Sequence, residues 1–126
     1  MNALIYTKDD MEYVSMARIL REESDRMDVF RDPLDGHGHC DYPYDIIVVA
    51  LEGAKGMNRV LEWSERYPNT GIIWLTSDPD FVMTAFQRHL SGFLIRPFHE
   101  AEFREAVGYA IRGEAWQNGR RMGVRG

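Results

Sequence analysis

Five positions each end or follow an apolar run of the kind that forms a buried strand, and four of them carry side chains that could do chemistry. They carry hydroxyl, ammonium, carboxylate and guanidinium groups, with a methyl group at one position. In chain order they are Thr7 with Lys8, Ala50, Glu52, Thr76 with Ser77, and Arg96. The carboxyl ends of parallel strands meet at one edge of a sheet, so we expect these groups to lie together.

Two opposite arrangements are compatible with these side chains. Lys8, Thr76 and Arg96 could form a pocket for a small anion such as phosphate, sulfate or a carboxylate. Alternatively, the two cations pair with acidic side chains and leave no anion site. The candidate acids are Asp9, Asp10, Glu52 and Asp78.

The apolar runs predict five strands. Residues 45–51 and 71–76 are apolar almost throughout, which is typical of parallel strands buried on both faces. Shorter runs at residues 3–6, 28–31 and 93–95 predict three more. The sequence between residues 32 and 43 contains proline and glycine without a helical apolar face, so we expect a loop with at most one helical turn.

Apolar side chains at helical spacing predict four helices between and after these strands. Asp9 precedes Glu12 at the spacing of a capping box, and Asp78-Pro79 is a typical helix start. Gly113 suits the end of the last helix. The predicted buried faces are Tyr13, Met16, Ala17 and Leu20; Met57, Val60, Leu61 and Ser64; Val82, Ala85, Phe86 and His89; and Phe103, Ala106, Val107, Ala110 and Ile111.

This alternation predicts an α/β fold with a doubly wound, five-stranded parallel sheet and a reduced or missing second helix. We expect one domain over residues 1–112. Residues 113–126 then form a flexible tail or the start of a linker, with Trp116 inside it.

Three segments resemble the receiver domains of response regulators, which have a CheY-like, flavodoxin-like fold. Residues 44–50 resemble the third receiver strand, and residues 72–76 resemble the fourth, which ends in Thr or Ser. Residues 93–98 resemble the fifth, which normally ends in Lys-Pro-Phe. Ala85-Phe86 is similar to a pair found in receivers of the LytTR subfamily. The resemblance covers most of the predicted domain.

The resemblance implies phosphoryl transfer to an aspartate at the end of the third strand, with two further acids holding Mg²⁺. Here the acceptor position is Ala50, and Thr7-Lys8 replaces the acidic pair. Arg96 stands at the lysine position, and only Thr76 matches the family pattern. We therefore expect a pseudo-receiver that is not phosphorylated, is not an enzyme and has no catalytic residue.

The resemblance also places a partner surface, for another protein or for a second copy, on the last two helices. The candidate switch and interface residues are Phe81, Arg88, His89, Phe93, Phe103 and Tyr109, with Phe93 at the aromatic switch position. The alternative is that most of these aromatic residues belong to the core.

Composition narrows the remaining possibilities. The net charge of -5 and the pI near 5.3 argue against direct nucleic-acid binding by this domain. A single cysteine and the lack of a signal-peptide pattern or long apolar run suggest a cytoplasmic protein without membrane contact. Asp35, His37, His39 and Cys40 are zinc-binding types, but their spacing is too tight for a tetrahedral site, so we expect no metal or cofactor.

Three functions remain open. The first is a signalling domain that acts by phosphorylation-independent protein contacts or dimerisation. The second is the regulatory domain of a longer DNA-binding response regulator, whose output domain would follow residue 126. The third is a sensor of a small anion or ligand that uses the degenerate phosphorylation pocket.

Overall fold

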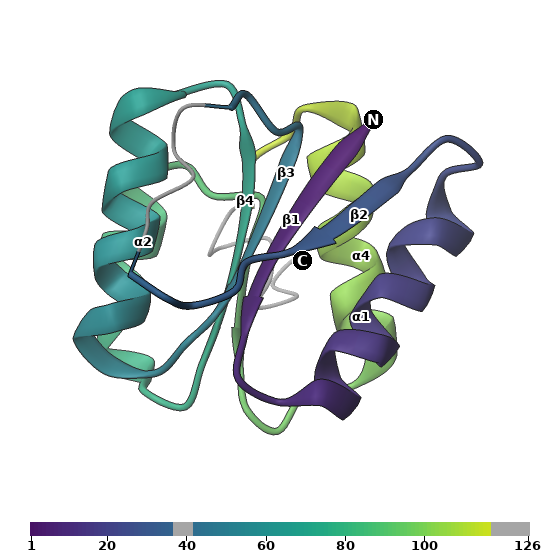
Figure 1. Cartoon of the computed structure of the whole chain (residues 1–126). Helices are drawn as coiled ribbons and strands as arrows, with labels where there is room; N and C mark the ends of the chain where they lie inside the picture. The colour runs from purple at the N-terminus through teal and green to yellow at the C-terminus, as the bar shows by residue number, and fades with distance from the viewer. Residues whose placement is uncertain (37–41, 117–126) are drawn as a thin grey trace.

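Five parallel strands form one sheet in the computed structural model, which describes residues 1–36 and 42–116 (Figure 1). The strands are β1 (Asn2–Thr7), β2 (Asp28–Arg31), β3 (Ile46–Ala50), β4 (Gly71–Thr76) and β5 (Gly92–Ile95). Their order across the sheet is β2-β1-β3-β4-β5. The predicted five-stranded parallel sheet is therefore confirmed, and β1 and β3 flank the point where the strand order reverses.

The central strands are buried on both faces because successive side chains point to opposite sides. Every residue of β3 is buried. Ile46, Val48 and Ala50 belong to one apolar core, whereas Ile47 and Val49 belong to the other. This explains why the strand sequence is apolar throughout instead of alternating with polar residues.

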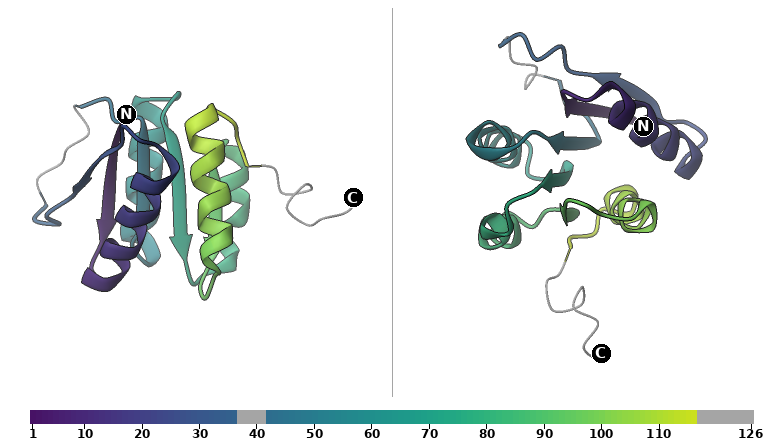
Figure 2. Two further views of the ribbon diagram at one scale, coloured as in Figure 1. Left: turned by 90° about the vertical axis from the view of Figure 1, so that its right-hand side faces the viewer. Right: turned by 90° about the horizontal axis from the view of Figure 1, so that it is seen from below.

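Four α-helices cover the two faces of the sheet. Helices α1 (Asp10–Glu23) and α4 (Glu100–Arg112) lie on one face, and α2 (Gly53–Arg66) and α3 (Val82–Gln87) lie on the other (Figure 2). A short 3₁₀ turn, η1 (Pro79–Phe81), leads into α3. In the described part of the chain, no helix connects β2 to β3, as the loop composition predicts.

The predicted helix ends are confirmed. The Asp9 carboxylate accepts hydrogen bonds from the backbone N–H groups of Met11 and Glu12 at 2.9 and 3.0 Å. Asp78 likewise accepts from Asp80 N at 2.9 Å at the start of η1. Gly113 follows α4 with a φ of 70°, the left-handed conformation that glycine adopts most readily.

Two predicted helix faces need correction. The buried face of α2 consists of Gly56, Val60 and Trp63, so Met57 and Leu61 lie at its margin. Helix α3 ends at Gln87, and His89 beyond it is exposed with a φ of 55°. His89 therefore does not share a helical face with Ala85, which is buried.

The residues directly after α4, up to Trp116, pack against the domain instead of forming a flexible tail. Trp116 is buried in the core on the α2 and α3 face, and its ring lies 5.8 Å from that of Phe93. Its backbone N–H donates a hydrogen bond to the Leu90 carbonyl at 2.6 Å. The packed domain thus extends to Trp116, beyond the predicted boundary at residue 112.

Candidate functional site

The carboxyl ends of four neighbouring strands bring the predicted polar residues together. Thr7 pairs with Ala50 in the register of β1 and β3, so the ends of these strands lie side by side. Thr76 pairs with Ile95 in the register of β4 and β5. The Arg96 N–H then donates to the Thr76 carbonyl at 2.9 Å, which fixes Arg96 at the same edge.

Arg96 lies between two carboxylates. Its Nε donates to Glu52 Oε2 at 2.9 Å, and its Nη2 donates to Glu12 Oε1 at 3.0 Å. Its Nη1 also donates to the other oxygen of Glu12. Pairing with Glu12 raises the pKa of the Arg96 guanidinium most, and Glu52 adds to this effect against the opposing effect of burial. Arg96 is therefore bound on two sides by groups of this chain.

Glu52 accepts hydrogen bonds from Thr76 at the end of β4, from Ser77 directly after it, and from Arg96. Its Oε1 accepts hydrogen bonds from Thr76 Oγ1 at 3.1 Å and from Ser77 N at 2.8 Å. Ser77 Oγ donates to Oε2 at 3.2 Å. Partial burial would raise the pKa of the Glu52 carboxyl, but these hydrogen bonds together outweigh burial and hold it below its ordinary value. Glu52 is thus favoured as a charged carboxylate.

Glu12 is the site residue that sequence reasoning missed. Its place three residues after Asp9 suggests that it reaches back to the helix start, as in a capping box. Instead, its carboxylate accepts from Thr7 Oγ1 at 2.8 Å and binds Arg96. The useful signal was its position: the first turn of a helix that follows β1 lies at the carboxyl edge of the sheet.

The contacts form one continuous series from β1 to β4. Both threonines are buried; Thr7 donates to Glu12, Thr76 donates to Glu52, and Arg96 joins the two carboxylates. We call Thr7, Glu12, Arg96, Glu52 and Thr76 the Thr–Glu–Arg network. At this edge of the sheet the sequence allows either an anion pocket or internal ion pairs. The structure shows internal ion pairs, between Arg96 and the two glutamates.

The other candidate acids have different roles. Asp9 and Asp78 cap helix starts, and Asp10 pairs with Arg31 at 2.7 Å. Ala50 is buried at the end of β3, and its carbonyl lies 3.4 Å from Arg96 Nη2. In residues 1–36 and 42–116, Lys8 is exposed and does not join the network.

Comparisons with known proteins bear on the fold. No family model matches the chain, and no curated protein matches it. Among solved structures, a LuxR family DNA-binding response regulator from Silicibacter pomeroyi superposes with a TM-score of 0.72 at 15% identity, covering 90% of this chain and 93% of that one. A response regulator receiver domain protein from Clostridium thermocellum gives 0.69 at 16% identity, covering 98% of both chains.

A third similar structure is a receiver domain in its activated state. The BeF3-activated receiver domain of DrrB, a protein of Thermotoga maritima, gives a TM-score of 0.69 at 16% identity and covers 88% of this chain and 97% of that one. The chain has the receiver fold. At these identities the similarity shows the architecture, and the roles of residues must come from the site itself.

Within this receiver fold, three of the six candidate interface residues are core. Phe93, Phe103 and Tyr109 are buried, and Phe103 is only 1% exposed. Phe93 packs edge-on against Trp74, with the ring centroids 5.5 Å apart. These residues therefore do not form an exposed surface, which corrects their assignment to a partner face.

The other three candidates lie near the surface around α3. Phe81 is half-buried and stacks on Trp74 at 5.0 Å between ring centroids. Arg88 forms an ion pair with Glu65 at 3.3 Å, and His89 is exposed. Two residues that the sequence analysis did not select, Met83 and Phe86, are 59% and 46% exposed on α3.

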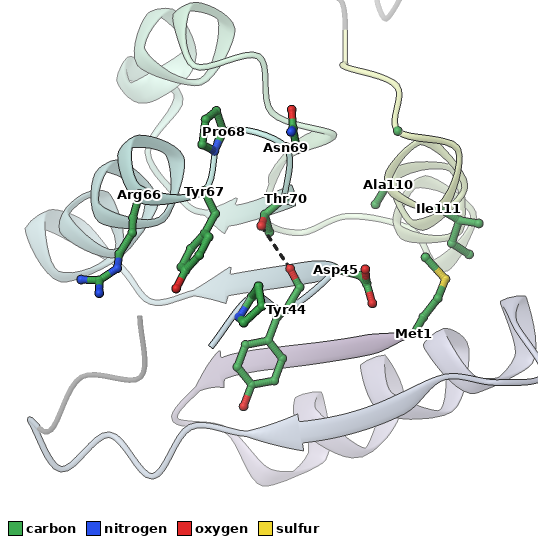
Figure 3. A pocket seen from close by; sticks show the side chains of 12 residues that line it. Met1, Tyr44, Asp45, Arg66, Tyr67, Pro68, Asn69, Thr70, Ala110 and Ile111 are labelled. Atoms are coloured by element: carbon green, nitrogen blue, oxygen red, sulfur yellow. Dashed lines mark hydrogen bonds between the residues drawn. The ribbon is translucent and has the colours of Figure 1, made fainter. Parts of the chain in front are cut away.

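A separate hollow of about 440 Å³ lies at the opposite, amino edge of the sheet (Figure 3). Tyr44, Asp45, Tyr67 and Thr70 line part of it, and Thr70 Oγ1 donates to the Tyr44 carbonyl at 3.1 Å. Its polar groups do not converge with those of the Thr–Glu–Arg network, because the two features lie at opposite strand ends.

The described residues contain no cluster of three or more metal-binding side chains. Of the loop residues considered for zinc, His37, His39 and Cys40 lie outside the described residues. Across residues 1–36 and 42–116, none of the helices has the length and apolar character needed to cross a bilayer.

Proposed function

We propose that this chain is a receiver-fold signalling module in which Glu52 supplies the anion that a phosphoryl group supplies in phosphorylated receivers. The observation that carries the proposal is the set of donors on one carboxylate: the Thr76 hydroxyl, the Ser77 amide and Arg96 Nε, at 3.1, 2.8 and 2.9 Å. The resemblance assigns phosphate sensing to the hydroxyl and charge balance to the cation. Both groups here already bind Glu52.

Two features support independence from phosphorylation. Ala50, at the end of β3, carries a methyl group and no oxygen that could attack a phosphoryl donor. Lys8 follows β1 where the family has acids for Mg²⁺, and an ammonium repels a divalent cation. The module therefore signals by binding, and its conformation is set by partners and not by covalent modification.

The experiment is an amide NMR titration with beryllofluoride and Mg²⁺. The receiver domain of DrrB, which has been obtained in the BeF3-activated state, serves as the positive control. We expect the signals of Thr76 and Ser77 in this chain to stay in place while those of the control shift. Saturable shifts at Thr76 and Ser77 would overturn the proposal.

We assign partner contact to the exposed surface of α3. Met83 and Phe86 are large apolar residues in solvent, and Arg88 and His89 lie beside them as a polar rim. Apolar anchors with a polar rim are typical of protein interfaces. Either a second copy or another protein can occupy such a surface.

Sedimentation at several protein concentrations separates these two occupants. If the occupant is a second copy, the average mass rises with concentration and Phe86→Ser abolishes the rise. Val14→Ser is a matched control, because Val14 is 59% exposed on α1, on the other face of the sheet. A constant monomer mass would exclude self-association and leave a different protein as the partner.

A further inference from the structure

A cavity of about 280 Å³ beside the Thr–Glu–Arg network contains both lysines of the chain in its lining. It lies between the end of β1, the segment after β2 and helix α2, where no helix connects β2 to β3 in the described residues. Lys8 comes from the segment after β1, and Lys55 comes from the first turn of α2. Arginine supplies all other cationic side chains of the protein, so the position of both lysines at one cavity is distinctive.

Helix α2 adds two further donors to this lining. Lys55, Asn58 and Arg59 have i, i+3 and i+4 spacing, which places them on one ridge of the helix. Asp32 is the one acidic residue among the described residues of the lining. Three cations and one acid therefore meet at this cavity, although the whole chain carries a net charge of -5.

The two ammonium groups form no direct ion pair with the described residues, although Asp32 lines the same cavity. Neither Lys8 nor Lys55 has an ion-pair or hydrogen-bond partner there, whereas Arg59 pairs with Glu62 at 3.0 Å. Lys55 also lies in the first turn of α2, which contains no acidic residue. A cation at a helix N-terminus is unfavourable because the dipole is positive there, and a bound anion would offset both effects.

The remaining lining indicates what the anion is attached to. Leu34 and Leu51 contribute apolar surface to the cavity. A volume of about 280 Å³ is at the lower end for ligand pockets, which suits a compound with one small ring or short chain. Primary ammonium and guanidinium groups together are typical ligands of phosphate oxygens.

We propose that this cavity binds a small phosphate monoester without a covalent bond. The phosphoryl group lies between Lys8 and Lys55, with Arg59 and Asn58 as further donors, and the organic group contacts Leu34 and Leu51. Binding at this site does not require phosphorylation and does not depend on the role of Glu52.

The neighbouring cavity of about 270 Å³ is a poorer site for the same ligand. It shares Lys8 and Lys55 but is also lined by Glu12 and Glu52. Arg96, which could attract an anion there, is already bound by these two carboxylates. The anion site of this chain is therefore displaced from Arg96 toward α2.

The chain is suited to a direct test, because reductive ¹³C-methylation labels only Lys8, Lys55 and the amino terminus. Methylation keeps the positive charges. The amino terminus begins β1 and lies at the opposite edge of the sheet, so its signal is an internal control. The protein is titrated with phenyl phosphate, inorganic phosphate and phenol in separate experiments at constant ionic strength.

We expect saturable shifts of both lysine signals with phenyl phosphate, weaker binding of inorganic phosphate, and no shift with phenol or at the amino terminus. Equal affinity for the two phosphates would overturn the monoester assignment. Linear drift of all three signals would mean charge screening only and would overturn the site.

Unlabelled variants, followed by calorimetry, locate the site. Lys55→Gln and Lys8→Gln should each weaken phenyl phosphate binding at least about tenfold, the usual size for one charge-assisted contact. Arg66→Gln at the other end of α2 makes the same change in net charge and should leave the affinity unchanged. Equal weakening by Arg66→Gln would overturn the site, as would full affinity in both lysine variants.

Discussion

The molecule contains two arginine-centred clusters whose chemistry is the same but whose surroundings differ. Arg96 joins Glu12 and Glu52 at the strand ends, and Arg104 joins Glu22, Glu23 and Glu100 between α1 and α4. The two guanidinium side chains are equally exposed, at 27% and 29%.

The difference lies in their partners. The Glu12 side chain is 16% exposed and also accepts from the buried Thr7 hydroxyl, whereas Glu22 is 47% exposed on a helix surface. An exposed carboxylate such as Glu22, or Glu52 at 50% exposure, can be rehydrated when its arginine is lost, but Glu12 is largely shielded from water. Burial of Glu12, and not the number of ion pairs, therefore sets the difference in stability that we expect between the two clusters.

The largest expected effect is that of Arg96→Ala. The substitution leaves Glu12 and Glu52 close together without their shared cation, and we expect unfolding free energy to fall by about 2 kcal/mol. Urea unfolding measures the loss. Arg104→Ala is the matched control and should cost clearly less, although it breaks more ion pairs. Equal losses would remove the distinction between the two clusters.

Next in size is the effect of neutralising one carboxylate. Glu12→Gln keeps the shape of the side chain and should reduce unfolding free energy by about 1 kcal/mol, whereas Glu52→Gln, at a side chain that is 50% exposed, should cost less. Glu22→Gln is the control in the exposed cluster and should change stability less. A larger loss for Glu22→Gln than for Glu12→Gln would contradict the role of burial.

Acid should weaken the Thr–Glu–Arg network through Glu52. The pKa of this carboxyl is lowered in the fold from its ordinary value of 4.5. Its stabilising contribution is therefore complete above pH 4.5 and is lost as the pH falls through the lower folded value. The pKa values of Glu22 and Glu100 are lowered too, so the test is a comparison: Glu52→Gln should show a shallower loss of stability below pH 4.5 than wild type. Identical slopes would contradict it.

The smallest expected effect is that of salt. Salt weakens the attraction between charges in solvent, with a screening length of about 8 Å at physiological ionic strength, and weakens it much less for buried charges. Adding salt should therefore reduce the stability difference between wild type and Arg104→Ala more than the difference between wild type and Arg96→Ala. Thermal unfolding at low and high sodium chloride concentration measures both. A stronger salt dependence for Arg96→Ala would reverse the comparison.

The sequence was sufficient to predict the sheet because burial on both faces leaves an unmistakable apolar run, as in residues 46–50. The gathering of Thr7, Ala50, Thr76 and Arg96 at one edge follows from parallel topology alone. The predicted buried face of α3 was wrong at Phe86 and His89 because the helix is short. It has six residues, which are too few for helical spacing to indicate burial.

The pairing of side chains could not be predicted in the same way. Glu12 has two local options, the helix start and the strand ends, and the Asp9 N–H that it would accept from in a capping box donates to Thr7 Oγ1 at 3.2 Å instead. The docking of Trp116 was also missed, because a lone tryptophan after a helix-ending glycine has no periodic pattern that indicates burial. Both outcomes depend on contacts between residues that are distant in sequence.

The most direct measurement for the central claim is a pH titration of the Glu52 carboxyl carbon by NMR, read together with the Ser77 amide. If Glu52 is the resident anion at Thr76, Ser77 and Arg96, the two signals titrate together with a midpoint below 4.5. A midpoint at or above 4.5, with a Ser77 amide that does not follow it, would contradict the account.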